Sequence, residues 1–223
     1  MRSLNRGLNL KIVTYYSKEF TSSDTFLLPD AIVHVGAVAG GGGGAMIAVA
    51  GSEAGGGGGG AIAFATLPRM PAGTLLTVTI GAAGAGRTGS TGDGAVGGTT
   101  TIAGPGGEFY LSATGGFGGS SAATPGVGGA GGATFHMGGK TGNTGETGAT
   151  DGNDFGGDGA DSIYNLVKYG APVLGGLGST SNNVSGLAPA AGVYGAGGGG
   201  GTGAGSGGSG SAGAVYFWWA ANS

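Results

Sequence analysis

The chain has 223 residues, enough for one domain or two small ones. Glycine supplies 62 of them and cysteine is absent, which excludes a disulfide framework and a thiolate metal site. Charged residues make up only 9% and the net charge is −3, which argues against nucleic acid as the main partner, because phosphate binding needs an excess of Lys and Arg. The 39% hydrophobic content excludes a charged, solvated coil. We also expect no membrane insertion and no cleaved secretion signal, since no apolar run is long enough.

The first eighteen residues are basic, and no acidic residue precedes Glu19. This segment contains four of the eight Lys and Arg residues, namely Arg2, Arg6, Lys11 and Lys18. Two interpretations are open: a solubilising terminus, or an arm that attaches the protein to an acidic surface of a partner. We therefore divide the chain into an attachment arm (residues 1–18) and one glycine-rich β domain (residues 19–223).

Strand structure is predicted from residue 20 onward. Residues 20–26 are typical of two short strands around a Ser-Asp turn, and residues 31–35 of a strand with two apolar faces. His34 lies in this second stretch. We expect it to be a hydrogen-bonded residue of the core or of an interface.

Three uninterrupted glycine runs occur, at residues 40–44, 55–60 and 197–201. Such runs are commonly flexible linkers. Here each run adjoins apolar residues that are able to pack, which favours polyproline-II-type strands without internal hydrogen bonds. These strands must bond to neighbouring strands, and an all-glycine strand, bare on every side, fits the centre of a bundle. Residues 55–60 would span roughly 19 Å in this geometry.

Further strands are predicted downstream. Residues 76–80 alternate apolar residues with threonine, as in a half-buried strand, and residues 99–102 and 108–113 are shorter candidates. Residues 215–219 are apolar on both faces, which predicts burial on both sides, in the subunit core or at a subunit interface. The predicted fold class is all-β: a β-sandwich or jelly-roll-like body with packed polyglycine strands and no substantial helix.

Residues 115–190 are expected to form the variable loops. Residues 139–150 repeat Gly-X-Thr four times, which predicts an outer strand of the bundle with glycine on its inner face. Loops on a rigid scaffold commonly carry recognition. The candidates for ligand contact in and near this region are Phe117, Phe135, His136, Phe155, Tyr164, Tyr169 and Tyr194. For His136, packing between its neighbours is the alternative.

One motif indicates calcium. Residues 156–164 match the nine-residue pattern G-G-x-G-x-D-x-U-x of calcium-binding β-rolls. Asp154, Asp158 and Asp161 would supply hard oxygen ligands. Only one repeat and a fragment are present, so an acidic solvated turn is the alternative. We expect no other cofactor and no enzyme, because no Ser/His/Asp, Cys/His or paired-carboxylate arrangement has supporting context.

The order of these segments resembles a known family. The sequence carries FTSSDTFLLPDAIVHVGAVAGGGGG, then AGGGGGGAIAF, then MPAGTLLTVTIGAAGAG, and finally GAGGGGGTGAGSGGSGSAGAVYFWW. This order is similar to the glycine-rich domain of bacteriophage tail-fibre and tail-tip proteins. The resemblance covers residues 20–86 and 195–220.

The resemblance implies a virion structural protein of the tail fibre or tail tip that attaches the phage to the host surface. It also implies a homotrimer outside the cell, in contact with other tail proteins and with a bacterial surface receptor. The basic arm would then join the virion through Arg2, Arg6, Lys11 and Lys18. Two alternatives stay open: a virion component without recognition, such as a head decoration or fibre connector, and a free polyproline-II protein that binds a surface such as ice.

Overall fold

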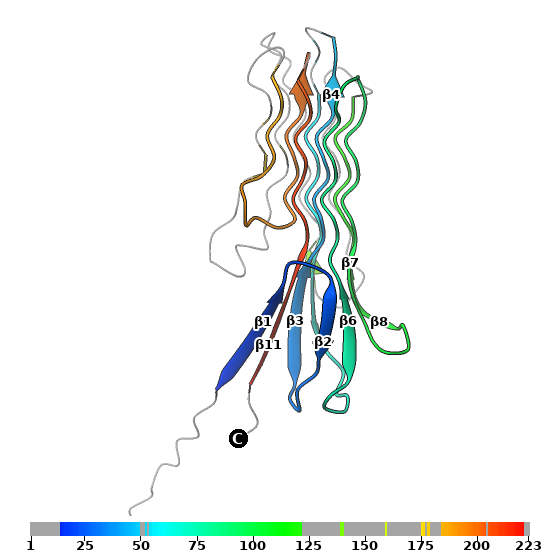
Figure 1. Ribbon diagram of the computed structural model, residues 1–223, viewed down its shortest axis with the longest axis vertical. Helices are drawn as coiled ribbons and strands as arrows, with labels where there is room; N and C mark the ends of the chain where they lie inside the picture. Colours follow the sequence, from blue (N-terminus) through cyan, green and yellow to red (C-terminus); the bar gives the residue numbers. More distant parts are fainter. Residues whose placement is uncertain are drawn as a thin grey trace, which may run out of the picture.

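The computed structural model describes residues 14–49, 52, 54–121, 139–140, 159, 175–176, 178, 184–203 and 205–220. These residues form an all-β fold, and none of them lies in a helix. The molecule is elongated, with β-sheets at one end and a bundle of extended glycine strands at the other (Figure 1). The prediction of an all-β protein is therefore confirmed.

Two antiparallel sheets form the β-sandwich. The five-stranded sheet has the spatial order β1 (Tyr15–Phe20), β11 (Ala214–Ala220), β3 (Val33–Val38), β5 (Ile62–Thr66) and β9 (Gly139–Lys140). The four-stranded sheet has the order β2 (Asp24–Leu27), β6 (Leu75–Thr79), β7 (Thr100–Ala103) and β8 (Phe109–Ala113). β11 lies between β1 and β3, although nearly the whole described chain separates it from them in sequence.

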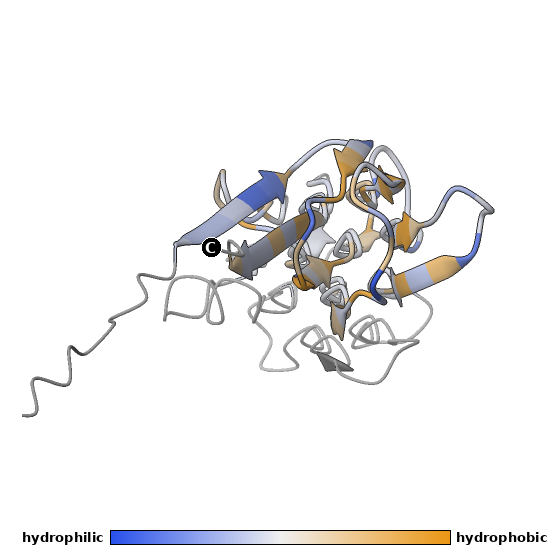
Figure 2. Ribbon diagram, turned by 90° about the horizontal axis from the view of Figure 1, so that it is seen from below, coloured by the Kyte–Doolittle hydropathy of each residue, from blue (hydrophilic) through white to orange (hydrophobic). Residues whose placement is uncertain are grey.

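The hydrophobic core lies between these two sheets. Leu76 and Val78 of β6 are buried while the threonines between them are exposed, as the alternation predicts. Phe217 of β11 is fully buried; its ring stacks on Phe26 with 4.1 Å between centroids and meets Phe20 edge-on at 5.7 Å. Seen along the long axis, apolar residues occur on strands of both sheets (Figure 2).

Six sandwich strands continue without a break into glycine segments of the bundle. Three strands run into the segments that follow them: β3 into residues 39–46, β6 into residues 81–87 and β8 into residues 114–121. The other three strands are preceded by their segments: residues 54–61 lead into β5, residues 92–98 into β7 and residues 205–213 into β11. Residues 195–203 add a seventh glycine segment, which pairs through the short strand β10 (Gly201–Thr202) with β4 (Met46–Ile47). The turns between glycine segments therefore lie at the end of the molecule away from the sandwich (Figure 1).

Residues 39–46 form the central strand of the bundle. From residue 40 to residue 45, every N–H and every C=O is hydrogen-bonded to another glycine segment. The donors go in rotation to three neighbours: Gly40 donates to Gly98, Gly41 to Ser211 and Gly42 to Gly58, after which the cycle repeats. The carbonyls accept from three further segments at residues 84–87, 116–119 and 198–201. A period of three is that of a polyproline-II-type strand, so the packed polyglycine prediction is confirmed.

Close backbone contact explains why these positions are glycine. A Cβ on Gly40 would lie 2.0 Å from the carbonyl oxygen of Ala82, and a Cβ on Gly42 would lie 2.0 Å from that of Phe117. Neighbouring backbones thus occupy the space that any side chain would need. Glycine is therefore required here because no space is left for a side chain, and not because the backbone adopts an unusual φ angle.

Outer segments differ in the expected way. In residues 81–87, Gly81 and Gly84 are buried against the bundle, while Ala82, Ala83 and Ala85 are exposed. Glycine therefore faces inward and side chains face solvent on this peripheral segment. The Gly-X-Thr repeat at residues 139–150, for which we predicted the same arrangement, lies outside the described residues except for β9.

Two predictions for the sandwich were wrong in detail. The strand expected at residues 31–35 is β3, which begins at Val33, and Ile32 is exposed. The last strand was expected to be buried on both faces, but among its four aromatic residues only Phe217, which faces the core, is fully buried. Trp218 on the other face is half-buried, because it packs beside ring systems of its own sheet rather than under a second layer.

His34 lies on this outer face and is half-buried. Its Nδ1 lies 2.9 Å from the Thr66 hydroxyl, and its ring stacks on Trp218 at 5.6 Å between centroids. The hydrogen bond that we expected is therefore present, but the residue belongs to the sheet surface and not to the core.

The Thr100 side chain joins the sandwich to the bundle. Its buried hydroxyl donates to the Val38 carbonyl and accepts from the Gly81 N–H, both at 2.9 Å. We expect Thr100→Val to lower the free energy of unfolding by about 2 kcal/mol, because it removes two buried hydrogen bonds without changing the side-chain volume. Urea denaturation measures the loss. Thr101→Val, at the half-buried next position, is the control, and an equal loss in both variants would contradict the explanation.

Candidate functional site

Side chains stand on the outer glycine segments in rows spaced three residues apart. Val96 and Phe117 lie in two such rows and are 56% and 54% exposed. Their segments are antiparallel neighbours, joined by a 2.9 Å hydrogen bond from Gly97 N–H to the Gly116 carbonyl. This register places Val96 directly beside Phe117. The two side chains form an exposed apolar pair on a surface otherwise built of backbone and small residues.

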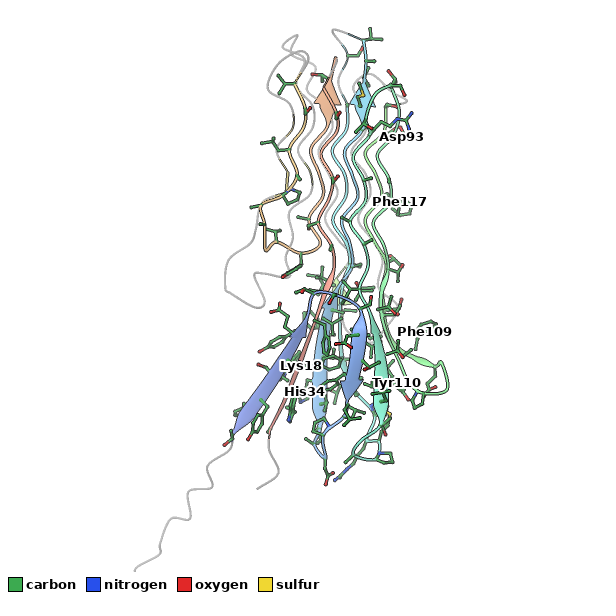
Figure 3. All side chains as sticks on the ribbon, in the orientation of Figure 1. Lys18, His34, Asp93, Phe109, Tyr110 and Phe117 are labelled. Atoms are coloured by element: carbon green, nitrogen blue, oxygen red, sulfur yellow. The ribbon has the colours of Figure 1, made fainter. Side chains whose placement is uncertain are left out.

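A carboxylate lies next to this pair. Asp93 is three residues, or one turn, before Val96 and is exposed. Its Oδ1 accepts hydrogen bonds from the Ser121 N–H at 2.7 Å and the Ser121 hydroxyl at 3.1 Å. Asp93 and Phe117 project from the same side of the bundle (Figure 3). Sequence reasoning had singled out Phe117 but neither Val96 nor Asp93, although the spacing of three was visible.

The remaining predicted contact residues have different positions. Tyr194 is half-buried and packs against a small cluster of Val38, Ile62 and Ala214, so it has a packing role. Five candidates lie outside the described residues: Phe135, His136, Phe155, Tyr164 and Tyr169.

A family model described as a glycine-rich domain matches residues 21–220, which is most of the chain. The chain belongs to this family. The glycine-rich domain therefore comprises both the bundle and nearly all of the sandwich, from the turn after β1 to the end of β11. A search of curated proteins found no match.

The sandwich end of the glycine-rich domain exposes apolar side chains that sequence reasoning missed. They lie at or beside the strand ends that face away from the bundle. The alternation of apolar and polar residues predicts burial within a strand, so it makes no prediction about exposure at these ends. We call them the sandwich-end apolar belt: Tyr15, Tyr16, Leu27, Ile32 and Leu75. Exposed apolar side chains that gather in one place are typical of surfaces that contact another molecule.

The predicted attachment arm adjoins this belt. Lys18 lies within β1, with its Nζ 4.7 Å from the centroid of the Phe20 ring, and residues 15–18 pair with β11. The end of the arm is thus an edge strand of the sandwich. Arg2, Arg6 and Lys11 lie outside the described residues.

Calcium binding by the acidic motif stays a prediction. Asp154, Asp158 and Asp161 all lie outside the described residues. Within the described ranges, no three His, Asp or Glu side chains are grouped in a way that would hold a metal ion. The described part of the chain also contains no helix long and apolar enough to span a membrane.

The hairpin between β7 and β8 carries the one coupled pair of titrating groups that the described residues reveal. The Tyr110 hydroxyl donates to Glu108 Oε1 on the exposed side of the hairpin (Figure 3). This bond holds the pKa of Glu108 below its ordinary value, aided by backbone N–H groups of the turn. The same bond, with the nearby charge, raises the pKa of Tyr110.

We expect this hydrogen bond to be lost at both ends of the pH scale, because each of its two partners titrates. Its contribution to stability is present above the unfolded pKa of glutamate, about 4.3, and is lost as pH falls through the lower folded value. At high pH it is lost once tyrosine ionises, above about pH 10. NMR titration of the Glu108 carboxyl should give a lower midpoint in the wild type than in Tyr110→Phe. Equal midpoints would contradict the assignment.

Proposed function

We propose that the protein is a structural component of a bacteriophage tail fibre or tail tip and attaches the particle to the host cell surface. The observation that carries this proposal is the difference between the two ends of the molecule. One end presents the sandwich-end apolar belt and the start of β1, which residues 1–13 precede. The other end consists of turns between glycine segments (Figure 1).

The bundle between the two ends of the molecule is suited to act as a rigid spacer. Its central strand has every backbone group from residue 40 to residue 45 bonded to surrounding segments, so bending would break many hydrogen bonds together. Recognition usually resides in loops and side chains held on such a scaffold. In this arrangement the sandwich end docks on the virion, and the far turns and the sides of the bundle meet the bacterium.

The assembly that we propose is a homotrimer on the tail, outside the cell. Its partners are other tail proteins at the sandwich end and a bacterial surface receptor at the bundle. The basic residues Arg2, Arg6, Lys11 and Lys18 would contact an acidic surface of the tail protein. Neither catalysis nor a cofactor is needed for this role.

Two measurements test the proposal. Immunogold labelling of purified particles should place the protein on the tail, and added purified protein should reduce phage adsorption to host cells. A version lacking residues 1–13, which keeps β1 intact, should still reduce adsorption but should be missing from assembled particles. Labelling of the head, or unchanged adsorption at saturating protein, would instead favour a virion component without recognition.

A further inference from the structure

We infer that the side of the bundle carrying Asp93, Val96 and Phe117 is a binding site for a saccharide chain. The inference rests on the proposed attachment function and names the chemical class of the receptor. Phe117 is the starting point because the fold does not need it. Its neighbours Gly116 and Gly118 show that this segment packs through backbone, and the phenyl ring is more than half exposed.

An exposed aromatic ring on a flat surface suits the apolar face of a sugar ring. Val96 beside Phe117 widens this apolar platform, and no charged residue lies on the exposed rows of these two segments apart from Asp93. Because the underlying segments are glycine-rich, the platform is flat and open along the bundle axis. Such a surface admits an extended polymer, whereas a closed pocket would admit only a single small molecule.

Polar groups lie one turn away from the ring. The Oδ1 atom of Asp93 accepts both hydrogen bonds from Ser121. Its Oδ2 atom has no hydrogen-bond partner among the described residues, so this oxygen is available to accept hydrogen bonds from sugar hydroxyls. One turn is about 9 Å at 3.1 Å per residue. An aromatic ring and a hydrogen-bonding carboxylate at this spacing would contact neighbouring units of one oligosaccharide.

The backbone adds a donor to the same side. Gly118 is three residues before Ser121, so its N–H points in the direction of the Ser121 N–H, which binds Asp93. Within the described part of the chain the Gly118 N–H has no hydrogen-bond partner, and the residue is half-buried rather than enclosed. The site therefore offers an apolar face, an acceptor and a donor, which matches the mixed surface of a saccharide.

The test is binding of the full-length protein to an array of bacterial O-chain and capsular oligosaccharides, followed by calorimetry with the best-bound oligosaccharide. The two sets of sugars distinguish lipopolysaccharide from capsule as the source. Phe117→Ala should weaken binding by about tenfold or more. Asp93→Asn keeps an oxygen for Ser121 but removes the charge, and should weaken binding by several-fold without changing the melting temperature.

Phe109→Ala is the matched control, because Phe109 is 61% exposed but lies on β8 of the sandwich (Figure 3). It should bind the oligosaccharide like the wild type. Absence of glycan binding, or equal losses in Phe117→Ala and Phe109→Ala, would overturn the inference. If Phe117→Ala instead changes the oligomeric state in light scattering, the surface is a contact between copies and the inference also fails. In each of these cases, adsorption blocking by the wild type tests the proposed function separately.

Discussion

Replacing Gly42 with alanine should lower the free energy of unfolding by about 4 kcal/mol, enough to unfold a marginally stable protein. The new Cβ would lie 2.0 Å from the Phe117 carbonyl oxygen and 2.5 Å from its carbon. No side-chain rotation can relieve this overlap, because both partners are backbone atoms in a segment bonded on all sides. Chemical denaturation followed by circular dichroism measures the effect.

Gly92→Ala is the matched control for Gly42→Ala. It adds the same methyl group to another glycine segment of the bundle, but the nearest atom is Arg87 Nε at 2.7 Å, in a flexible side chain that can move. We expect a loss below about 1 kcal/mol there. If the two variants were equally stable, close packing of backbones would not be the reason for glycine at residue 42.

Replacing Phe217 with alanine should lower the free energy of unfolding by about 4 kcal/mol as well. The ring is fully buried between the sheets and contacts both Phe20 and Phe26, so its removal leaves a cavity at the centre of the sandwich. Phe217→Leu should lose less, about 1.5 kcal/mol, because most of the volume remains. The urea denaturation midpoints of the two variants test whether Phe217→Ala is less stable than Phe217→Leu.

The exposed Phe109 provides a control for Phe217 as well as for Phe117. Truncating it to alanine should change the free energy of unfolding by no more than about 0.5 kcal/mol. A loss for Phe217→Ala as small as this would mean that β11 is not part of the cooperative core.

Much of the fold follows from periodicity in the sequence. Alternation predicted β6, and uninterrupted glycine with apolar flanks predicted a bare strand at the centre of a bundle, which is where residues 39–46 lie. In both cases the pattern repeats along one strand and therefore indicates which sides of that strand are buried. The same rule failed for Trp218, because an apolar face can be shielded by aromatic neighbours on its own sheet, and sequence spacing along one strand contains no information about those neighbours.

The candidate site was less predictable. Phe117 stood out as an aromatic residue among glycines, but its partners Val96 and Asp93 come from another segment, and their proximity depends on the antiparallel register of two glycine strands. Glycine strands lack the side-chain pattern that normally specifies register. The sandwich-end apolar belt was missed for a related reason, since its residues gather only when separate strand ends meet.

The position of the central strand also has a consequence for biosynthesis. Gly41 and Gly44 find their acceptors at Ser211 and Gly208, and β3 finds one of its two neighbours in β11. While the ribosome is still making residues 46–200, neither the bundle centre nor the five-stranded sheet can close. A strand without side chains gains nothing from hydrophobic collapse in the meantime, so the bundle and the five-stranded sheet should form only after about 170 further residues have followed the first glycine run. The nascent chain is then a long, weakly charged polymer, and the rate at which cells accumulate native protein should depend on protection from aggregation more than on the speed of translation.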